Sequence, residues 1–161
     1  MYTQDDFTQV KSILKKRWWI TAAPAAVILL AAIAVFVAGR IARSGQMWMV
    51  TAALTVLGGV YFLFFYGVYV RPALLYKNHV NYMLNGRKRE TTGIFKAFSD
   101  DVSDKDGIDC YAMLVNVGER DDAEDDRLFY FDVQKPKPQI PLGTRVTVES
   151  NDKMVADLKT A

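Results

Sequence analysis

Two long apolar runs dominate the first half of the chain. Residues 18–39 contain no acidic or basic side chain, and neither do residues 44–70 once Arg43 is passed. A helix needs about 20 apolar residues to cross the hydrocarbon layer, so each run is long enough to span a membrane. The pattern predicts a transmembrane helical hairpin over 18–70, with spans of about 18–39 and 47–70. Because charged groups mark most ion and proton pathways, we do not expect a pump or transporter.

Helical periodicity continues on both sides of this hairpin. Apolar residues at positions 7, 10, 13 and 14 alternate with lysines. They predict an amphipathic helix over 1–17 that lies on the membrane surface and continues into the first span. Residues 71–89 predict a basic juxtamembrane helix and linker, with Pro72 near its start and Asn85-Gly86 at its end.

From Glu90 onward the period changes from helical to alternating. Five short runs rich in β-branched and aromatic residues follow one another, TTGIFKAF, IDCYAMLVNV, RLFYFDV, TRVTVES and KMVADLK. Turn-forming stretches separate them, including SDDVSDKDG and GERDDAEDD. The fold class we predict is an α+β membrane protein, in which residues 90–161 form a small five-stranded antiparallel β-barrel of the OB or SH3-like kind.

The alternation also predicts which side chains face the core of this module. The inward candidates are Ile94, Phe95, Phe98, Cys110, Ala112, Leu114, Phe129, Phe131, Val146, Val148 and Val155.

Basic residues flank the hairpin unequally. Nine lysines and arginines lie just outside the two spans, whereas the connection RIARSGQ holds two arginines. By the positive-inside rule, we expect a multi-pass protein of the plasma (inner) membrane with both termini cytoplasmic. A cleaved signal peptide is the alternative for the first run, but that run is longer than usual and a second span follows it. The residues expected at the membrane interface are Trp18, Trp19, Trp48, Tyr66, Tyr69, Arg71, Arg87, Lys88 and Arg89.

The net charge of +2 conceals opposite charges in the two halves. Residues 1–89 carry eleven Lys and Arg against two acids, whereas residues 90–161 carry nine against sixteen. Nucleic-acid binding by the second half is therefore not expected, because phosphates need clustered cations.

The acids concentrate in the two stretches expected to form hairpin loops. They keep the barrel soluble and its edges unpaired, or they bind a basic partner, or they bind calcium. The candidate partner-binding residues are Asp100, Asp101, Asp104, Asp106, Asp121, Asp122, Glu124, Asp125 and Asp126.

Candidate chemistry is sparse. Setting Gly107 at position 6 of an EF-hand loop puts Val102 and Met113 at positions 1 and 12, so two required ligands are missing. His79 is the only histidine and has no metal-ligand partner, and Cys110 is the only cysteine, expected as a small buried strand residue. We therefore predict no enzyme activity, no metal and no cofactor.

Two resemblances concern layout. NGRKRE followed by DVSDKDG resembles the PilZ family, which would imply cyclic di-GMP binding, although Arg87 and Arg89 stand closer together, and Asp101, Ser103 and Gly107 further apart, than that motif requires. The order of helices and barrel, with the strand LGTRVTV, resembles NfeD-like membrane proteins, whose soluble domain is OB-like.

These patterns favour a non-enzymatic membrane-anchored adaptor or accessory subunit. Its hairpin would contact membrane lipid, and its cytoplasmic β module would bind a protein partner, in a larger membrane complex or by self-association. The alternative is a membrane-tethered module that senses a nucleotide or a divalent cation.

Overall fold

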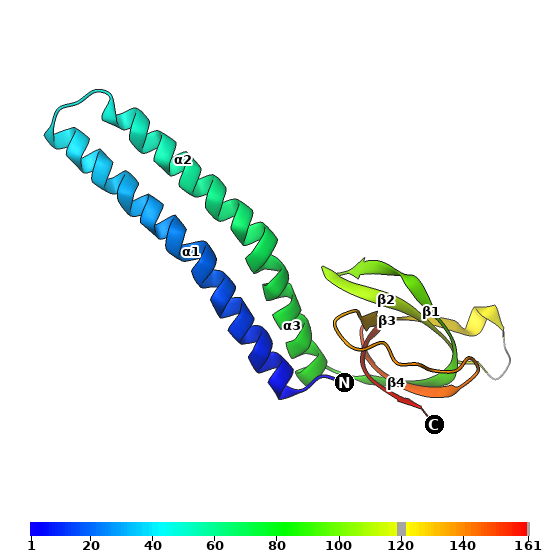
Figure 1. Ribbon diagram of the computed structural model, residues 1–161. Coiled ribbons are helices and arrows are strands. Elements are labelled where there is room, and N and C mark those ends of the chain that lie inside the picture. The colour runs from blue at the N-terminus through cyan, green and yellow to red at the C-terminus, as the bar shows by residue number, and fades with distance from the viewer. Residues whose placement is uncertain (119–121, 161) are drawn as a thin grey trace. The chain divides into compact units, whose positions relative to one another are not determined.

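The computed structural model describes residues 1–118 and 122–160, which form two compact units. One unit comprises residues 10–74, and the other combines residues 1–9 with the chain from residue 75 onward. Two long apolar helices precede a five-stranded mixed sheet, so the predicted α+β composition is confirmed (Figure 1).

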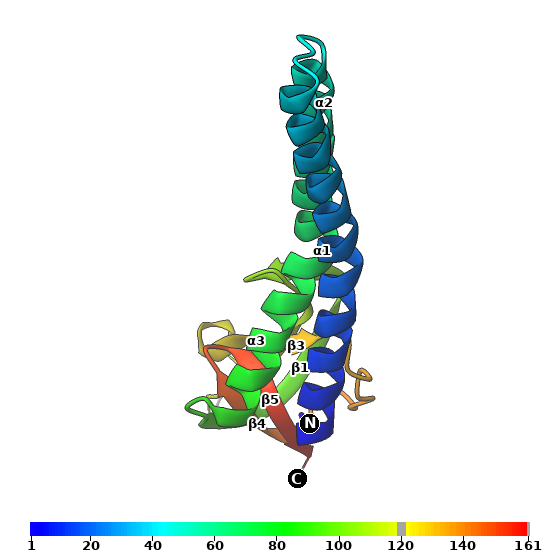
Figure 2. The ribbon, with the colours of Figure 1, turned by 90° about the vertical axis from the view of Figure 1, so that its left-hand side faces the viewer.

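The two apolar runs form the two arms of a helical hairpin. Helix α1 covers Gln4–Ile41, and the second arm consists of α2 (Met47–Phe65), the π-helical turn η1 (Tyr66–Val70) and α3 (Arg71–Asn85). Both arms are long and apolar enough to cross a membrane. Figures 1 and 2 show α1 and α2 side by side.

Polar contacts between the arms lie near the end of the hairpin opposite its connecting loop. The Arg17 guanidinium donates to the Tyr69 carbonyl at 3.0 Å, and the Tyr61 hydroxyl donates to the Ile20 carbonyl at 3.0 Å. Such bonds satisfy donors and acceptors where water is scarce. A small apolar cluster adjoins them, consisting of Leu14, Val70 and Ala73 with Tyr66 and Leu74.

The π-helical turn precedes Pro72 in the second arm. Proline has no N–H to give to the carbonyl four residues earlier, and its ring clashes with that carbonyl, so a regular α-helical ladder cannot run through it. A π turn is one way in which a helix accommodates such an interruption. The helix expected to begin near Pro72 and to end at Asn85-Gly86 is α3 (Arg71–Asn85), which follows η1 without a break.

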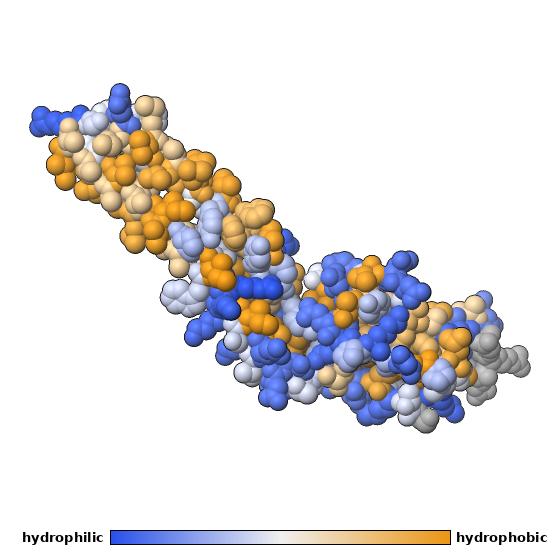
Figure 3. Space-filling model, viewed as in Figure 1, coloured by the Kyte–Doolittle hydropathy of each residue, from blue (hydrophilic) through white to orange (hydrophobic). Residues whose placement is uncertain are grey.

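The outer surface of the hairpin is apolar (Figure 3). Every residue of α2 is at least partly exposed, and Leu63 and Phe64 expose 70% and 58% of their surface. On α1, Leu30 exposes 64%. Soluble monomers rarely expose apolar surface on this scale. An exposed apolar surface of this size is typical of a membrane-contacting or protein-contacting face.

The sheet contains β1 (Arg89–Lys105), β2 (Ile108–Asn116), β3 (Asp126–Asp132), β4 (Arg145–Asn151) and β5 (Met154–Thr160), with a short 3-10 turn, η2 (Ala123–Asp125), before β3. The strand order is β1-β2-β3-β5-β4, and β4 pairs with β1, so the sheet closes on itself. The strands pair antiparallel except β3 and β5, which pair parallel. The predicted all-antiparallel arrangement is therefore wrong at one pair, because β3 and β5 run in the same direction where they meet at Tyr130 and Met154.

The first acidic stretch is not a loop. Strand β1 continues through Ser99 and Asp101 to Lys105, with an irregular register between Phe98 and Val102 that absorbs the extra polar residues. The turn itself is limited to Asp106 and Gly107, whose φ angles are 57° and 80°. Two consecutive left-handed residues are typical of the tight hairpin turn that Asp-Gly favours.

One main core fills the closed sheet. It consists of Phe95, Met113, Val115, Phe129, Phe131, Val146, Val148 and Val155. The predicted phase of β2 was wrong, because Met113 and Val115 face this core while Ala112 and Leu114 are only partly buried. Ile94, also predicted inside, is 42% exposed. Shifting a strand by one residue exchanges its two faces.

A second cluster packs on the other face of β2. It consists of Met83, Ile108, Cys110, Met154 and Ala156, with Tyr2, Leu75, Tyr76 and Tyr130 against it. The N-terminal residues and α3 thus cover part of the sheet, which explains why both faces of β2 are apolar.

Candidate functional site

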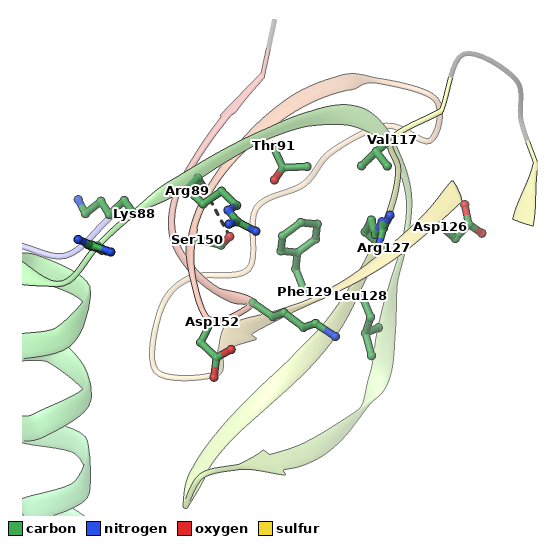
Figure 4. Close-up of a pocket in the computed structure, with 12 residues that line it drawn as sticks. Lys88, Arg89, Thr91, Val117, Asp126, Arg127, Leu128, Phe129, Ser150 and Asp152 are labelled. Carbon is green, nitrogen blue, oxygen red and sulfur yellow. Dashed lines mark hydrogen bonds between the residues drawn. The ribbon is translucent and has the colours of Figure 1, made fainter. Parts of the chain in front are cut away.

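A basic groove of about 1080 Å³ opens where the sheet closes between β3 and the β4–β5 turn (Figure 4). Its residues come from the linker and the start of β1, from β3, and from the end of β4 and the turn that follows. They are Arg87, Lys88, Arg89, Thr91, Val117, Asp126, Arg127, Leu128, Phe129, Ser150, Asp152 and Lys153. Five cations and two acids therefore line the groove.

Most of these cations have no ion-pair partner among the described residues. Lys88 lies 3.7 Å from Glu149, whereas no carboxylate in the described chain pairs with Arg87, Arg89, Arg127 or Lys153. The groove acid Asp126 is already engaged, because its Oδ1 accepts from Asn116 Nδ2 at 2.7 Å and lies 3.4 Å from Lys96 Nζ. The local field thus favours an anion, although residues 90–161 as a whole are acidic.

The groove also borders an incomplete strand pairing. Within the described chain, β3 and β5 pair at Tyr130 and Met154 alone, with the Tyr130 amide donating to the Lys153 carbonyl at 2.8 Å. The first four residues of β3 therefore have a partner strand on the β2 side but none on the β5 side. An unpaired strand edge is a ready template for another strand.

The predicted acidic residues fall into two separate groups. Asp104 pairs across the sheet with Asp109, and Asp126 pairs with Asn116, seven residues further along β2. At about 3.3 Å per residue, the two groups lie roughly 20 Å apart along that strand. Asp100, Asp101, Asp104 and Asp106 make up the first group, and Asp122, Glu124, Asp125 and Asp126 the second. The structure does not bring them into one surface, and Asp121 lies outside the described residues.

Several of these acids have structural roles. Asp104 Oδ1 accepts from the Gly107 amide at 3.1 Å and braces the β1–β2 turn. Asp122 Oδ1 accepts from the Glu124 amide at 3.2 Å and caps η2. Asp106 and Asp100 are exposed and pair with Lys105 and Lys137 respectively. Exposed pairs of this kind contribute little stability.

The residues predicted at the membrane interface also divide into groups. Trp18 and Tyr66 pack with ring centroids 5.9 Å apart, next to the Arg17–Tyr69 contact, and so mark one level of the hairpin. Trp48 lies at the opposite end, at the start of α2, and is 64% exposed. Trp19 is 66% exposed and Arg71 begins α3. Arg87, Lys88 and Arg89 instead line the groove.

A buried carboxylate network around Asp132 was not predicted from the sequence. This residue is fully buried, and its Oδ2 accepts from the hydroxyls of Tyr2 at 3.0 Å and Tyr76 at 2.8 Å. Its Oδ1 accepts from the Gln134 amide at 2.8 Å, and His79 Nε2 lies 2.9 Å from the Tyr2 hydroxyl. Burial and the nearby Asp132 carboxylate raise the pKa of Tyr2, which remains a neutral donor.

This network links the N-terminal segment, α3 and β3, and it has no free nucleophile. Burial, together with the Asp132 charge, raises the pKa of the neighbouring Cys110 thiol to about 12. The thiol is therefore unreactive at neutral pH, in keeping with the buried strand residue expected from the sequence. An acid within the apolar run RLFYFDV was the one signal that could have pointed to Asp132.

The PilZ-like residues are not assembled into one site. Arg87 and Arg89 line the groove, whereas Ser103 and Gly107 lie at the far end of the β1–β2 hairpin. Among residues 1–118 and 122–160, no three His, Cys, Asp or Glu side chains are placed to hold a metal ion. No family model, characterised protein or solved structure matches the chain significantly.

Proposed function

We propose that this protein is a non-enzymatic, membrane-anchored adaptor whose β module binds an acidic protein partner in the basic groove. The observation that carries the proposal is the gathering of five cations beside an unpaired strand edge in a module that is otherwise acidic. Charge complementarity of this kind steers association and fixes which partner is accepted. The groove replaces the acidic residues as the favoured partner site, because those residues lie in two separate groups.

In this proposal α1 and α2 cross the plasma (inner) membrane, and both chain ends are cytoplasmic. Support comes from the two long apolar helices, the exposed apolar surface of the hairpin and the unequal distribution of flanking cations. The Arg17 and Trp18 contacts with Tyr69 and Tyr66 would then lie at the cytoplasmic interface, where arginine and aromatic side chains are favoured.

We also assign the closed sheet to the small barrels of the OB kind. The order β1-β2-β3-β5-β4 with β4 returning to β1, and the short parallel contact of β3 with β5, support a partly open five-stranded barrel. Nucleic acid remains unexpected as a ligand. Binding of single strands uses exposed aromatic rings, and Phe129, the aromatic residue of the groove, is 5% exposed.

The test is purification of the tagged full-length protein from its native membranes in mild detergent. Three versions are compared, namely wild type, Arg127→Glu with Lys153→Glu, and the matched surface control Asp122→Asn with Glu124→Gln. The proposal predicts that specific co-purifying proteins are lost with the groove variant and with rising salt, and retained with the control. Loss with the control and retention with the groove variant would return the partner site to the acidic residues.

A second candidate function is sensing of an anionic small molecule such as a nucleotide. Arg87, Arg89, Arg127 and Lys153 line a groove whose volume of about 1080 Å³ is close to the upper range of small-molecule sites. This alternative predicts that a nucleotide raises the unfolding temperature of the full-length protein in detergent, and that Arg127→Glu abolishes the shift.

A further inference from the structure

The hydrogen-bonding direction of β3 follows from its ends. The Val117 amide donates to the Asp125 carbonyl, and the Val133 amide donates to the Asp109 carbonyl. In an antiparallel pair the bonded residues alternate, so Arg127 and Phe129 bond to β2. The N–H and C=O of Leu128 therefore point the other way, toward the groove.

The course of β5 explains why this edge is open. Strand β5 meets β3 in parallel at the Tyr130–Met154 pair. Strand β4 ends at Asn151, and the chain then reverses at Asp152 and Lys153, whose φ angles are 46° and 69°, before β5 begins at Met154. The described part of the chain places no strand beside residues 126–129 on this side, and Leu128 remains 39% exposed.

We propose that the acidic partner binds as an extended segment that adds a strand to β3 along residues 126–129. This proposal rests on the proposed function and names the class of partner. Strand addition obtains its affinity from main-chain hydrogen bonds and its specificity from alternate side chains. Four residues of β3 span roughly 13 Å, so a matching segment of four to six residues is long enough.

The chemistry of the walls specifies the segment further. Arg127 and Lys153 flank the open edge and require acids in the incoming strand, whereas Leu128 and Val117 offer apolar contact between them. The segment should therefore alternate acidic and apolar residues. A lipid headgroup or a free nucleotide would satisfy the cations but would leave the Leu128 N–H and C=O unpaired. An added strand satisfies both.

The test uses the full-length protein in detergent and a fluorescent peptide of about eight residues that alternates glutamate and valine. Two control peptides accompany it. One carries N-methyl groups on alternate amides, which keeps the charge but removes the strand's donors. The other has lysine in place of glutamate. Binding is measured by fluorescence anisotropy, and amide hydrogen exchange at Leu128 is followed by NMR.

We expect the glutamate peptide to bind and to slow exchange at Leu128 by tenfold or more, and both control peptides to lose at least roughly tenfold in affinity. Arg127→Glu with Lys153→Glu should weaken binding of the glutamate peptide by a similar factor. The charge-conserving variant, Arg127→Lys with Lys153→Arg, should bind it about as well as wild type. Lys105→Glu, at the far end of β1, is the matched control and should change affinity less than about twofold.

Other outcomes overturn this inference in distinguishable ways. Equal binding of the N-methylated peptide with unprotected Leu128 would reduce the groove to a simple anion site and leave the adaptor proposal standing. Protection of Leu128 by a single-stranded oligonucleotide or by anionic lipid vesicles, but not by the peptide, would show that the groove binds nucleic acid or a membrane surface and not a protein strand. Absence of peptide binding would refute strand addition, and the co-purification experiment would then decide the adaptor proposal separately.

Discussion

The amide of Tyr130 donates to the carbonyl of Lys153 at 2.8 Å, at the point where β3 and β5 meet. This bond belongs to the parallel Tyr130–Met154 pair, which joins β3 to β5 and closes the sheet between them. Just before Met154 the chain turns at Asp152 and Lys153, and the first half of β3, residues 126–129, lines the basic groove. The Tyr130–Lys153 bond thus marks the boundary between the paired part of β3 and the part that lines the groove.

The observed phase of β2 predicts different costs for two neighbouring truncations. Met113 is fully buried in the main core, whereas Leu114 is only partly buried on the opposite face. Met113→Ala should lower the free energy of unfolding by about 2–5 kcal/mol, and Leu114→Ala by less than about 2 kcal/mol. Native-state amide exchange in β2 and β4 measures both values. Equal costs, or a larger cost at Leu114, would contradict the register.

The buried Asp132 network predicts an effect of removing one hydroxyl. Tyr76→Phe removes a donor from a carboxylate that water does not reach, so it should lower the free energy of unfolding by about 1–3 kcal/mol. Tyr82→Phe on the same helix is the control, because Tyr82 is 64% exposed, and it should change stability by less than about 0.5 kcal/mol. Thermal unfolding of the full-length protein compares them. Equal unfolding temperatures for the two variants would show that the Asp132 network does not stabilise the fold.

The Cys110 thiol should resist modification in the folded protein. Its pKa, raised to about 12 chiefly by burial, leaves it protonated at pH 8, so the reactive thiolate forms only as the pH approaches that value. A maleimide should modify native protein at least about a hundredfold more slowly than urea-unfolded protein. Ser44→Cys, in the exposed hairpin connection, supplies the reactive control. Comparable rates at Cys110 and position 44 would show that the thiol is accessible.

Membrane orientation is tested with the same chemistry in intact cells. With Cys110→Ser as background, Ser44→Cys should react with a membrane-impermeant thiol reagent, whereas Asp122→Cys should react only after the cells are opened. The reason is the excess of flanking cations at the chain ends, which the positive-inside rule places in the cytoplasm. The reversed pattern would invert the proposed topology.

The sequence alone predicted the helices and strands whose apolar residues follow one clear pattern, either a long apolar run or strict alternation. Two apolar runs became the two long helices, and all five alternating runs became strands, because length and burial pattern determine each of these locally. The last two runs, TRVTVES and KMVADLK, are neighbours in the sequence and pair as the hairpin β4–β5, with its turn at Asp152 and Lys153.

Features that depend on distant contacts were missed. The stretch around Met113 is apolar on both faces because α3 and Tyr2 cover the outer face. Alternation of polar and apolar residues therefore could not show which residues of β2 face the main core. The acids of β1 resembled a loop because a register irregularity is not visible in composition. The groove combines Arg89, Arg127 and Lys153 from three places in the chain, and only the closed sheet brings them together.

The most direct test of the groove as the partner site is photo-crosslinking in intact cells. A photo-reactive amino acid replaces Leu128 at the open edge, and in separate strains it replaces Asp122 or Asp106, one from each acidic group. We expect a protein adduct from position 128 that disappears with Arg127→Glu and Lys153→Glu, and no such adduct from position 106. Adducts from 122 or 106 with none from 128 would contradict it.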